Sequence, residues 1–180
     1  ATITDIKVDK EEGYGLTQDA DNLFWNVSDG KDTEKADTTK AGTVTSAIGS
    51  LVYDKFVDYN CTDDAKYGFG DPYAVVTVKY SEEEAVESDE EDADSEESTE
   101  SSEENTDADS DTAESADASE EDSSEDEQET RTVEKTLTIY VGDETGDDRY
   151  VKVDDSKEVY TITKDSLTDI LDSTISDFYN

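Results

Sequence analysis

The chain of 180 residues has 53 acidic and 14 basic residues, a formal net charge of −39, no His and one Cys. This composition excludes catalytic triads that use His, zinc sites built from Cys and His, and any internal disulfide. The scarcity of Lys and Arg argues against binding to nucleic acid or to an anionic membrane surface, and it favours cations or basic proteins as partners.

The acidic residues are concentrated in one block. Residues 82–129 contain 26 Asp or Glu and no Lys or Arg, whereas the other residues hold the remaining 27 acids and all 14 bases. The apolar residues of the block are only alanines and Val86, too few to offset an ordering entropy of about 1–2 kcal/mol per residue. We therefore predict a disordered acidic insertion at 82–130, inside one domain made of residues 1–81 and 131–180.

The first third of the chain predicts a strand, a hairpin and a helix. Residues 2–8 (TITDIKV) have the pattern of a strand. Tyr14 and Leu16 are followed by a turn at 19–22 and a second extended run at 23–27, which predicts a β-hairpin with Trp25 in the core. A helix of about 40–54 should start at Asp37-Thr38-Thr39, with an apolar face of Val44, Ile48, Leu51, Val52 and Phe56.

The remaining elements complete a mostly antiparallel fold. FVDYN predicts a short extended segment, and TDDAKYG predicts one helical turn that ends at Gly68. Alternating apolar residues predict strands at 73–80 and 132–141, antiparallel neighbours on either side of the insertion, and two more at 149–153 and 158–162. A last helix should begin at Lys164-Asp165-Ser166, with Leu167, Ile170, Leu171, Ile175 and Phe178 on its apolar face. The expected fold is α+β, with a sheet of about six or seven strands and two packed helices.

The glycines in KYGFGDPYAVVTVKY raise the question of a phosphate-binding loop. A dinucleotide fingerprint needs a third glycine and lies between a strand and a helix. Here Gly68 and Gly70 precede Pro72 and a strand, so the order is wrong. We predict a structural turn in which Tyr67 packs against the core and Gly68 adopts a backbone conformation unfavourable for other residues.

Other candidate sites are weak. DADSDTAESADA has acids at Asp107, Asp109 and Asp111, the first positions of a calcium loop, but Thr112 and Ala118 stand where an EF-hand needs Gly and Glu. These aspartates are at most diffuse, low-affinity Ca²⁺ ligands. No catalytic or cofactor-binding residue is predicted, although so many carboxylates leave open a hydrolase that uses a carboxylate pair. Cys61 is interpreted as a small buried hydrophobic residue.

Several segments occur in an order typical of one family. They are DNLFWNV, LVYDKFVDY, AKYGFGDPYAVVTVKY and KTLTIYVGDETGDDRYVKVDDSKEVYTI, followed by the last helix. In this order the chain resembles the bacterial family called domain of unknown function 4340, over about residues 2–175 without the acidic block. The matching positions are Tyr67, Gly68, Pro72, Gly142, Tyr150, Val151, Val159 and Tyr160. Phe69 replaces the usual leucine, and the insertion replaces a tight turn.

The resemblance implies an extracytoplasmic domain behind an N-terminal membrane anchor, often in Gram-positive bacteria, with some relatives auxiliary to ABC-type export systems. It implies no catalytic residues. We therefore expect a non-enzymatic accessory or interaction domain of the cell envelope that binds a protein partner and contacts the membrane only through an anchor upstream of Ala1. A low-affinity Ca²⁺-binding surface protein and a carboxylate-dependent hydrolase remain the alternatives.

Overall fold

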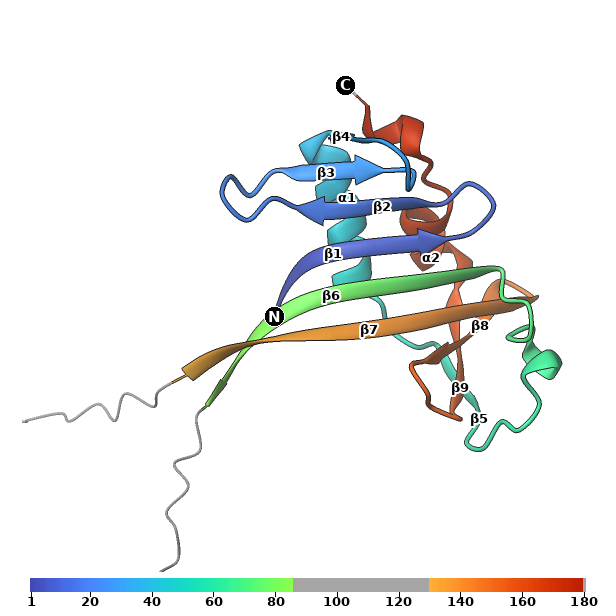
Figure 1. Cartoon of the computed structure of the whole chain (residues 1–180). Helices are drawn as coiled ribbons and strands as arrows, with labels where there is room; N and C mark the ends of the chain where they lie inside the picture. Colours follow the sequence, from blue (N-terminus) through green and yellow to red (C-terminus); the bar gives the residue numbers. More distant parts are fainter. Residues whose placement is uncertain (86–129, 180) are drawn as a thin grey trace, which may run out of the picture. The chain divides into compact units, whose positions relative to one another are not determined.

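Nine strands of the described residues form one antiparallel sheet in the order β4-β3-β2-β1-β6-β7-β8-β9-β5 (Figure 1). This computed structural model describes residues 1–85 and 130–179. The strands are β1 (Thr2–Asp9), β2 (Tyr14–Gln18), β3 (Trp25–Ser28), β4 (Thr33–Lys35), β5 (Lys55–Asp58), β6 (Ala74–Ala85), β7 (Thr130–Thr145), β8 (Asp148–Val153) and β9 (Val159–Thr163). The α-helices are α1 (Thr38–Gly49) and α2 (Lys164–Leu171), and the short 3₁₀-helices are η1 (Asp64–Tyr67) and η2 (Ile175–Phe178).

The α+β class and the two helices are confirmed, whereas the predicted number of strands was too low. The strand without a sequence signal is β4, whose three residues are all exposed. It forms by pairing with β3, where Ser28 lies opposite Thr33 and Asn26 opposite Lys35. A short edge strand with no apolar alternation cannot be recognised from hydrophobic periodicity alone.

Each face of the sheet contributes to a separate hydrophobic cluster. The larger cluster includes the fully buried Leu16, Ile170 and Phe178, and both α-helices lie on this side of the sheet (Figure 1). Burying one such side chain stabilises the fold by about 1.5–3 kcal/mol. Trp25, only 7 % exposed, belongs to this cluster, as predicted.

The smaller cluster joins the loop around η1 to the sheet. It consists of Cys61, Tyr67, Phe69 and Val159, with Tyr140 and Tyr150 packed against it. The predicted burial of Cys61 is confirmed, and its thiol donates to the carbonyl oxygen of Asp63.

Helix α1 starts where predicted but ends earlier. The Asp37 carboxylate accepts a hydrogen bond from the Lys40 amide at 2.8 Å, which caps the first turn. The helix ends at Gly49 instead of residue 54, because Gly49 is a poor helix former and the β-branched and aromatic run that follows pairs with β9 as β5. Val52 and Phe56, predicted on the buried face of the helix, are therefore 72 % and 56 % exposed.

The C-terminal segment forms two helices instead of one. Helix α2 ends at Leu171, and a new turn begins at Thr174, whose backbone and hydroxyl both bond the Asp177 carboxylate. This capping box starts η2, which returns Phe178 to the core.

The predicted insertion was too wide at both ends. Strand β6 continues to Ala85 and β7 begins at Thr130, so the two strands extend beyond the predicted boundaries at 82 and 130. The Lys135 ammonium binds the carboxylates of Glu82 and Glu84, the latter at 2.7 Å, and this pairing neutralises charge where the glutamates enter the sheet. The rest of the predicted insertion, including Asp107, lies outside the described residues.

Two glycines let the η1 loop approach β7 closely. Gly68 has φ of 82°, and a Cβ there would lie 2.6 Å from atoms of Asp143. A Cβ on Gly142 would lie 2.1 Å from the Tyr67 carbonyl oxygen. The Tyr67 ring, buried as predicted, packs edge-on against Tyr150 at 4.9 Å between centroids. The predicted structural turn at Gly68 is confirmed.

Candidate interaction surface

Exposed apolar side chains gather at one edge of the sheet. Of the nine exposed large hydrophobic residues in the described part of the chain, five fall within residues 52–59. We call these five the β5 patch: Val52, Tyr53, Phe56, Val57 and Tyr59. Because β5 is the last strand of the sheet, one side of its backbone has no neighbouring strand within the described residues. Sequence reasoning missed this surface because it assigned Val52 and Phe56 to the apolar face of a helix and predicted residues 56–60 as a short extended segment with no place in the sheet.

Three aromatic rings define the geometry of the patch. Tyr53 stacks on Tyr160 of β9 with 4.1 Å between centroids and 15° between planes. Phe56, which lies opposite Tyr160 across the β5–β9 pair, meets the same ring edge-on at 5.3 Å. We call Tyr53, Phe56 and Tyr160 the ring cluster. Tyr53 and Phe56 are 49 % and 56 % exposed, so much of each ring faces solvent.

Two carboxylates, Glu158 and Asp154, lie near the ring cluster. The Tyr160 hydroxyl donates to Glu158 at 2.7 Å, and this bond raises the pKa of Tyr160 above its ordinary value. The pKa of Tyr53 is raised mainly by partial burial and further by the negative charges of Glu158 and Asp154. Glu158 and Asp154 therefore bring negative charge close to the rings.

Lys55 of β5 is held away from the rings by two carboxylates. Its ammonium lies 2.6 Å from Asp54 and 3.0 Å from Asp148, and these contacts raise the pKa of Lys55. Asp148 is a buried carboxylate of β8, so Lys55 spans from the edge strand back toward the sheet. The same ammonium therefore joins the carboxylates of Asp54 and Asp148.

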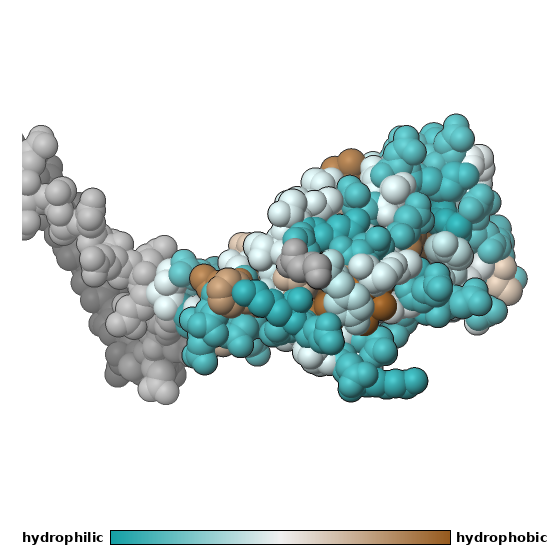
Figure 2. Space-filling view, turned by 90° about the horizontal axis from the view of Figure 1, so that it is seen from above, coloured by the Kyte–Doolittle hydropathy of each residue, from teal (hydrophilic) through white to brown (hydrophobic). Residues whose placement is uncertain are grey.

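The opposite edge of the sheet has a different surface. Strand β4 presents Thr33, Glu34 and Lys35, and the Lys35 ammonium lies 3.6 Å from the centre of the Phe24 ring. Figure 2 looks down on this end of the domain and shows a mainly hydrophilic surface with separate small hydrophobic spots.

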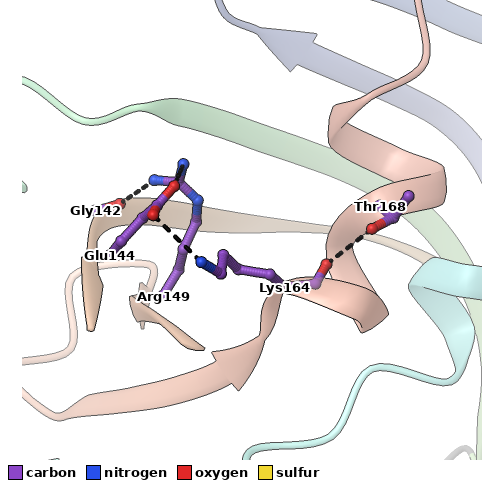
Figure 3. Close-up of polar contacts among 5 residues, drawn as sticks. All are labelled: Gly142, Glu144, Arg149, Lys164 and Thr168. Atoms are coloured by element: carbon purple, nitrogen blue, oxygen red, sulfur yellow. Dashed lines mark hydrogen bonds and ion pairs between the residues drawn. The ribbon is translucent and has the colours of Figure 1, made fainter. Parts of the chain in front are cut away.

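A small polar cleft lies beside α2. It has a volume of about 240 Å³ and is bordered by Tyr73, Arg149 and Lys164, among others. The Arg149 guanidinium donates to the Gly142 carbonyl at 3.0 Å and to Glu144 at 2.7 Å, and it lies 3.7 Å from the centre of the Tyr73 ring. Glu144 also accepts from Lys164 at the start of α2, at 3.3 Å (Figure 3). These contacts connect the β7–β8 hairpin to α2, so a structural role accounts for the charged groups of the cleft.

The residues predicted as weak Ca²⁺ ligands, Asp107, Asp109 and Asp111, lie outside the described residues. Within residues 1–85 and 130–179, no three His, Cys, Asp or Glu side chains converge as a metal site would require. None of the helices in this part of the chain is both long and apolar enough to cross a membrane.

Comparison with models of protein families, with curated proteins and with solved structures finds no match for this chain. The resemblance described from the sequence motifs therefore stays a prediction. Four of the residues that carry it, Tyr67, Gly68, Gly142 and Tyr150, meet at the corner between the η1 loop and β7.

Proposed function

We propose that this domain is a non-enzymatic interaction module that binds a protein partner by adding an extended strand of that partner to the open edge of β5. The observation that carries the proposal is the combination of an edge strand with exposed Phe56 and Val57. In strand addition the main chain supplies hydrogen bonds, and alternate side chains supply specificity. Exposed hydrophobic patches of this kind are typical of interaction sites.

Two features of β5 also occur on edges that proteins protect from pairing, namely a lysine and a bulge. The Lys55 ammonium is occupied by Asp54 and Asp148, so its charge is directed to the chain's own carboxylates. The bulge falls between Phe56 and Asp58. It shortens the segment that accepts a partner strand, and we expect specificity to depend on the aromatic side chains more than on a long ladder of hydrogen bonds.

The resemblance supports the setting that we propose for this interaction. It indicates a domain on the outer side of a cell membrane, attached through an upstream anchor. A subunit of an ABC-type export system is the partner class that it suggests. The absence of His and the acidic surface are compatible with this non-enzymatic role and favour a partner of opposite charge.

The proposal is tested by blocking the edge. Short random peptides of about ten residues, displayed on phage, are selected on the full chain and then measured on a Val57→Pro variant. Val57 lies in the bulge and has no register partner on β9, so proline there should disturb the β5–β9 pairing less than at Phe56 or Asp58, while its ring obstructs an added strand. We expect the selected peptides to bind the variant at least tenfold more weakly, a loss of about 1.4 kcal/mol.

The matched control is Thr33→Pro, which places proline at the first residue of the opposite edge strand. It should leave peptide binding unchanged, and thermal unfolding of both variants should show that they fold. Peptides that bind the Val57→Pro variant as tightly as the parent would refute strand addition at β5. A selection that enriches no peptide would refute it as well.

A further inference from the structure

Five aromatic rings of the described residues lie beneath a basic side chain, whereas the three rings of the ring cluster do not. Elsewhere the chain places a basic group over a ring: Lys35 over Phe24, Lys66 over Tyr67, Arg149 over Tyr73, and Lys152 over both Phe69 and Tyr140, at 3.6 to 5.4 Å. Within residues 1–85 and 130–179, no Lys or Arg lies over Tyr53, Phe56 or Tyr160. The ring cluster therefore offers aromatic faces that the chain itself leaves open.

The surroundings of these rings favour a positive charge. The quadrupole of an aromatic ring attracts a cation to its face, and a nearby carboxylate adds to that attraction. Glu158 bonds the Tyr160 hydroxyl at 2.7 Å, and the negative charges of Glu158 and Asp154 act on Tyr53. A cation on the ring cluster would thus meet both aromatic faces and carboxylates. Lys55 cannot serve this purpose while its ammonium binds Asp54 and Asp148.

We infer that the strand added to β5 carries arginine or lysine side chains at alternate positions and that these lie on the ring cluster. The inference rests on the proposed function, because it names the chemistry of the partner that strand addition would bring. Side chains on one face of a strand repeat every second residue. A basic residue and the next but one would therefore both point to the face of β5 that carries Phe56. Arginine is the better fit, since its planar guanidinium stacks on aromatic rings and pairs with carboxylates.

The expected effect of charge is moderate. A cation–π contact at an exposed site is worth roughly a two- to fivefold change in affinity. Two such contacts, together with the adjacent carboxylates, should make an arginine-bearing strand bind about tenfold more tightly than a neutral strand of the same shape.

The test compares two peptides on the ¹⁵N-labelled full chain. One has the sequence TVRVRVT, and in the other citrulline replaces both arginines, which removes the charge and preserves the shape. Titrations are followed by the amide NMR signals of β5 and β9 in about 0.3 M salt, which shortens the Debye length to about 6 Å and suppresses loose binding to the acidic block. We expect both peptides to shift these signals, and the arginine peptide to bind about tenfold more tightly.

Variants locate the source of the preference. In the Tyr53→Leu/Phe56→Leu double variant the two peptides should bind with similar affinity, whereas Phe24→Leu at the β4 end should leave the preference unchanged. Equal binding of both peptides to the parent at β5 would overturn this inference and leave strand addition intact. A preference for arginine that persists in the double variant would also overturn it, because the charge would then act elsewhere. If neither peptide shifts the β5 signals, the proposed function itself fails.

Discussion

The two edges of the sheet are protected in different ways. Strand β4 is three residues long, all exposed, and its Lys35 ammonium lies over the exposed ring of Phe24. Strand β5 exposes Phe56 and Val57, and its Lys55 is engaged with carboxylates. Since an open edge favours unwanted pairing, proteins commonly shorten it or place charge on it. The chain does so at β4 and leaves apolar surface at β5, and this contrast supports the proposal that a partner strand is added at β5.

The two edges also pack against different parts of the core. Glycine substitutions near each edge should therefore lower the free energy of unfolding by different amounts, and this is the largest effect that we expect. Gly68 supports the loop that covers the smaller cluster near β5, and its Cβ would collide with Asp143. Gly30, in the turn before β4, also has a positive φ, of 89°, but open space around its Cα. We expect Gly68→Ala to lower the free energy of unfolding by about 3 kcal/mol and Gly30→Ala by only about 1 kcal/mol.

Denaturant unfolding of the full chain measures both losses. Hydrogen exchange adds the location, since Gly68→Ala should increase exchange in β5 and β9 more than in β3. Equal losses for the two variants would mean that the collision at Gly68 is relieved without cost, and that the η1 loop does not support the β5 end.

A buried hydroxyl next to β5 offers a substitution that should raise the free energy of unfolding, whereas the glycine substitutions should lower it. Thr161 of β9 is only 3 % exposed, and its Oγ1 has no hydrogen-bond partner in the described part of the chain. Leaving such a group unsatisfied costs about 1–3 kcal/mol, whereas an apolar group of the same shape avoids that cost. We expect Thr161→Val to raise the free energy of unfolding by about 1 kcal/mol.

The corresponding change at the other edge is Thr33→Val in β4. Thr33 is exposed, so this substitution should alter stability by less than about 0.5 kcal/mol. Chemical denaturation of the two variants provides the comparison. A loss of stability in Thr161→Val would show that its hydroxyl is satisfied, for example by an ordered water molecule.

The contact of the Lys35 ammonium with the Phe24 ring at the β4 edge should make a small but measurable contribution to stability. Removing the positive charge with Lys35→Gln should cost about 0.5 kcal/mol, because the contact with Phe24 is exposed. More informative is binding: the uncovered Phe24 should gain a weak affinity for the arginine peptide. This gain should appear as new shifts of the Phe24 and Trp25 amide signals. If none appear, an open ring alone is insufficient, and the carboxylates beside the β5 ring cluster are essential.

The smallest expected effect is the pH dependence of stability that Asp58, at the end of β5, contributes. Hydrogen bonds from the Asn60 amide and then the Tyr67 hydroxyl lower the pKa of Asp58 below its ordinary value of 3.8. A carboxyl with a lowered pKa in the folded state stabilises the fold above its unfolded pKa, and this contribution disappears as the pH falls through the folded value. The stability difference between the parent and Asp58→Asn should therefore be constant from about pH 7 to 5 and shrink below about pH 4. A difference that does not change with pH would contradict the assignment.

The same contrast explains how much of the fold the sequence could predict. Alternating apolar residues predicted β1, β6 and β7, because these strands bury one face. Strand β4 has no buried residue, and its existence depends on pairing with β3. The run from Leu51 to Phe56 has helical spacing, yet its position at an exposed edge follows from the pairing of β5 with β9, more than 90 residues later in the chain. The candidate surface depends on this long-range contact, so local patterns could not indicate it.

The strand order has a consequence for a chain cut once between residues 86 and 129. The first fragment would contribute β1 to β6 and the second β7 to β9. Because β6 pairs with β7 at one side and β5 pairs with β9 at the other, the first fragment holds the second between two of its own strands. Separating the fragments would require both strand pairs to open, together with the contact between α1 and α2. A nicked chain should therefore remain associated, and the two pieces should reassemble when mixed, as a split reporter does.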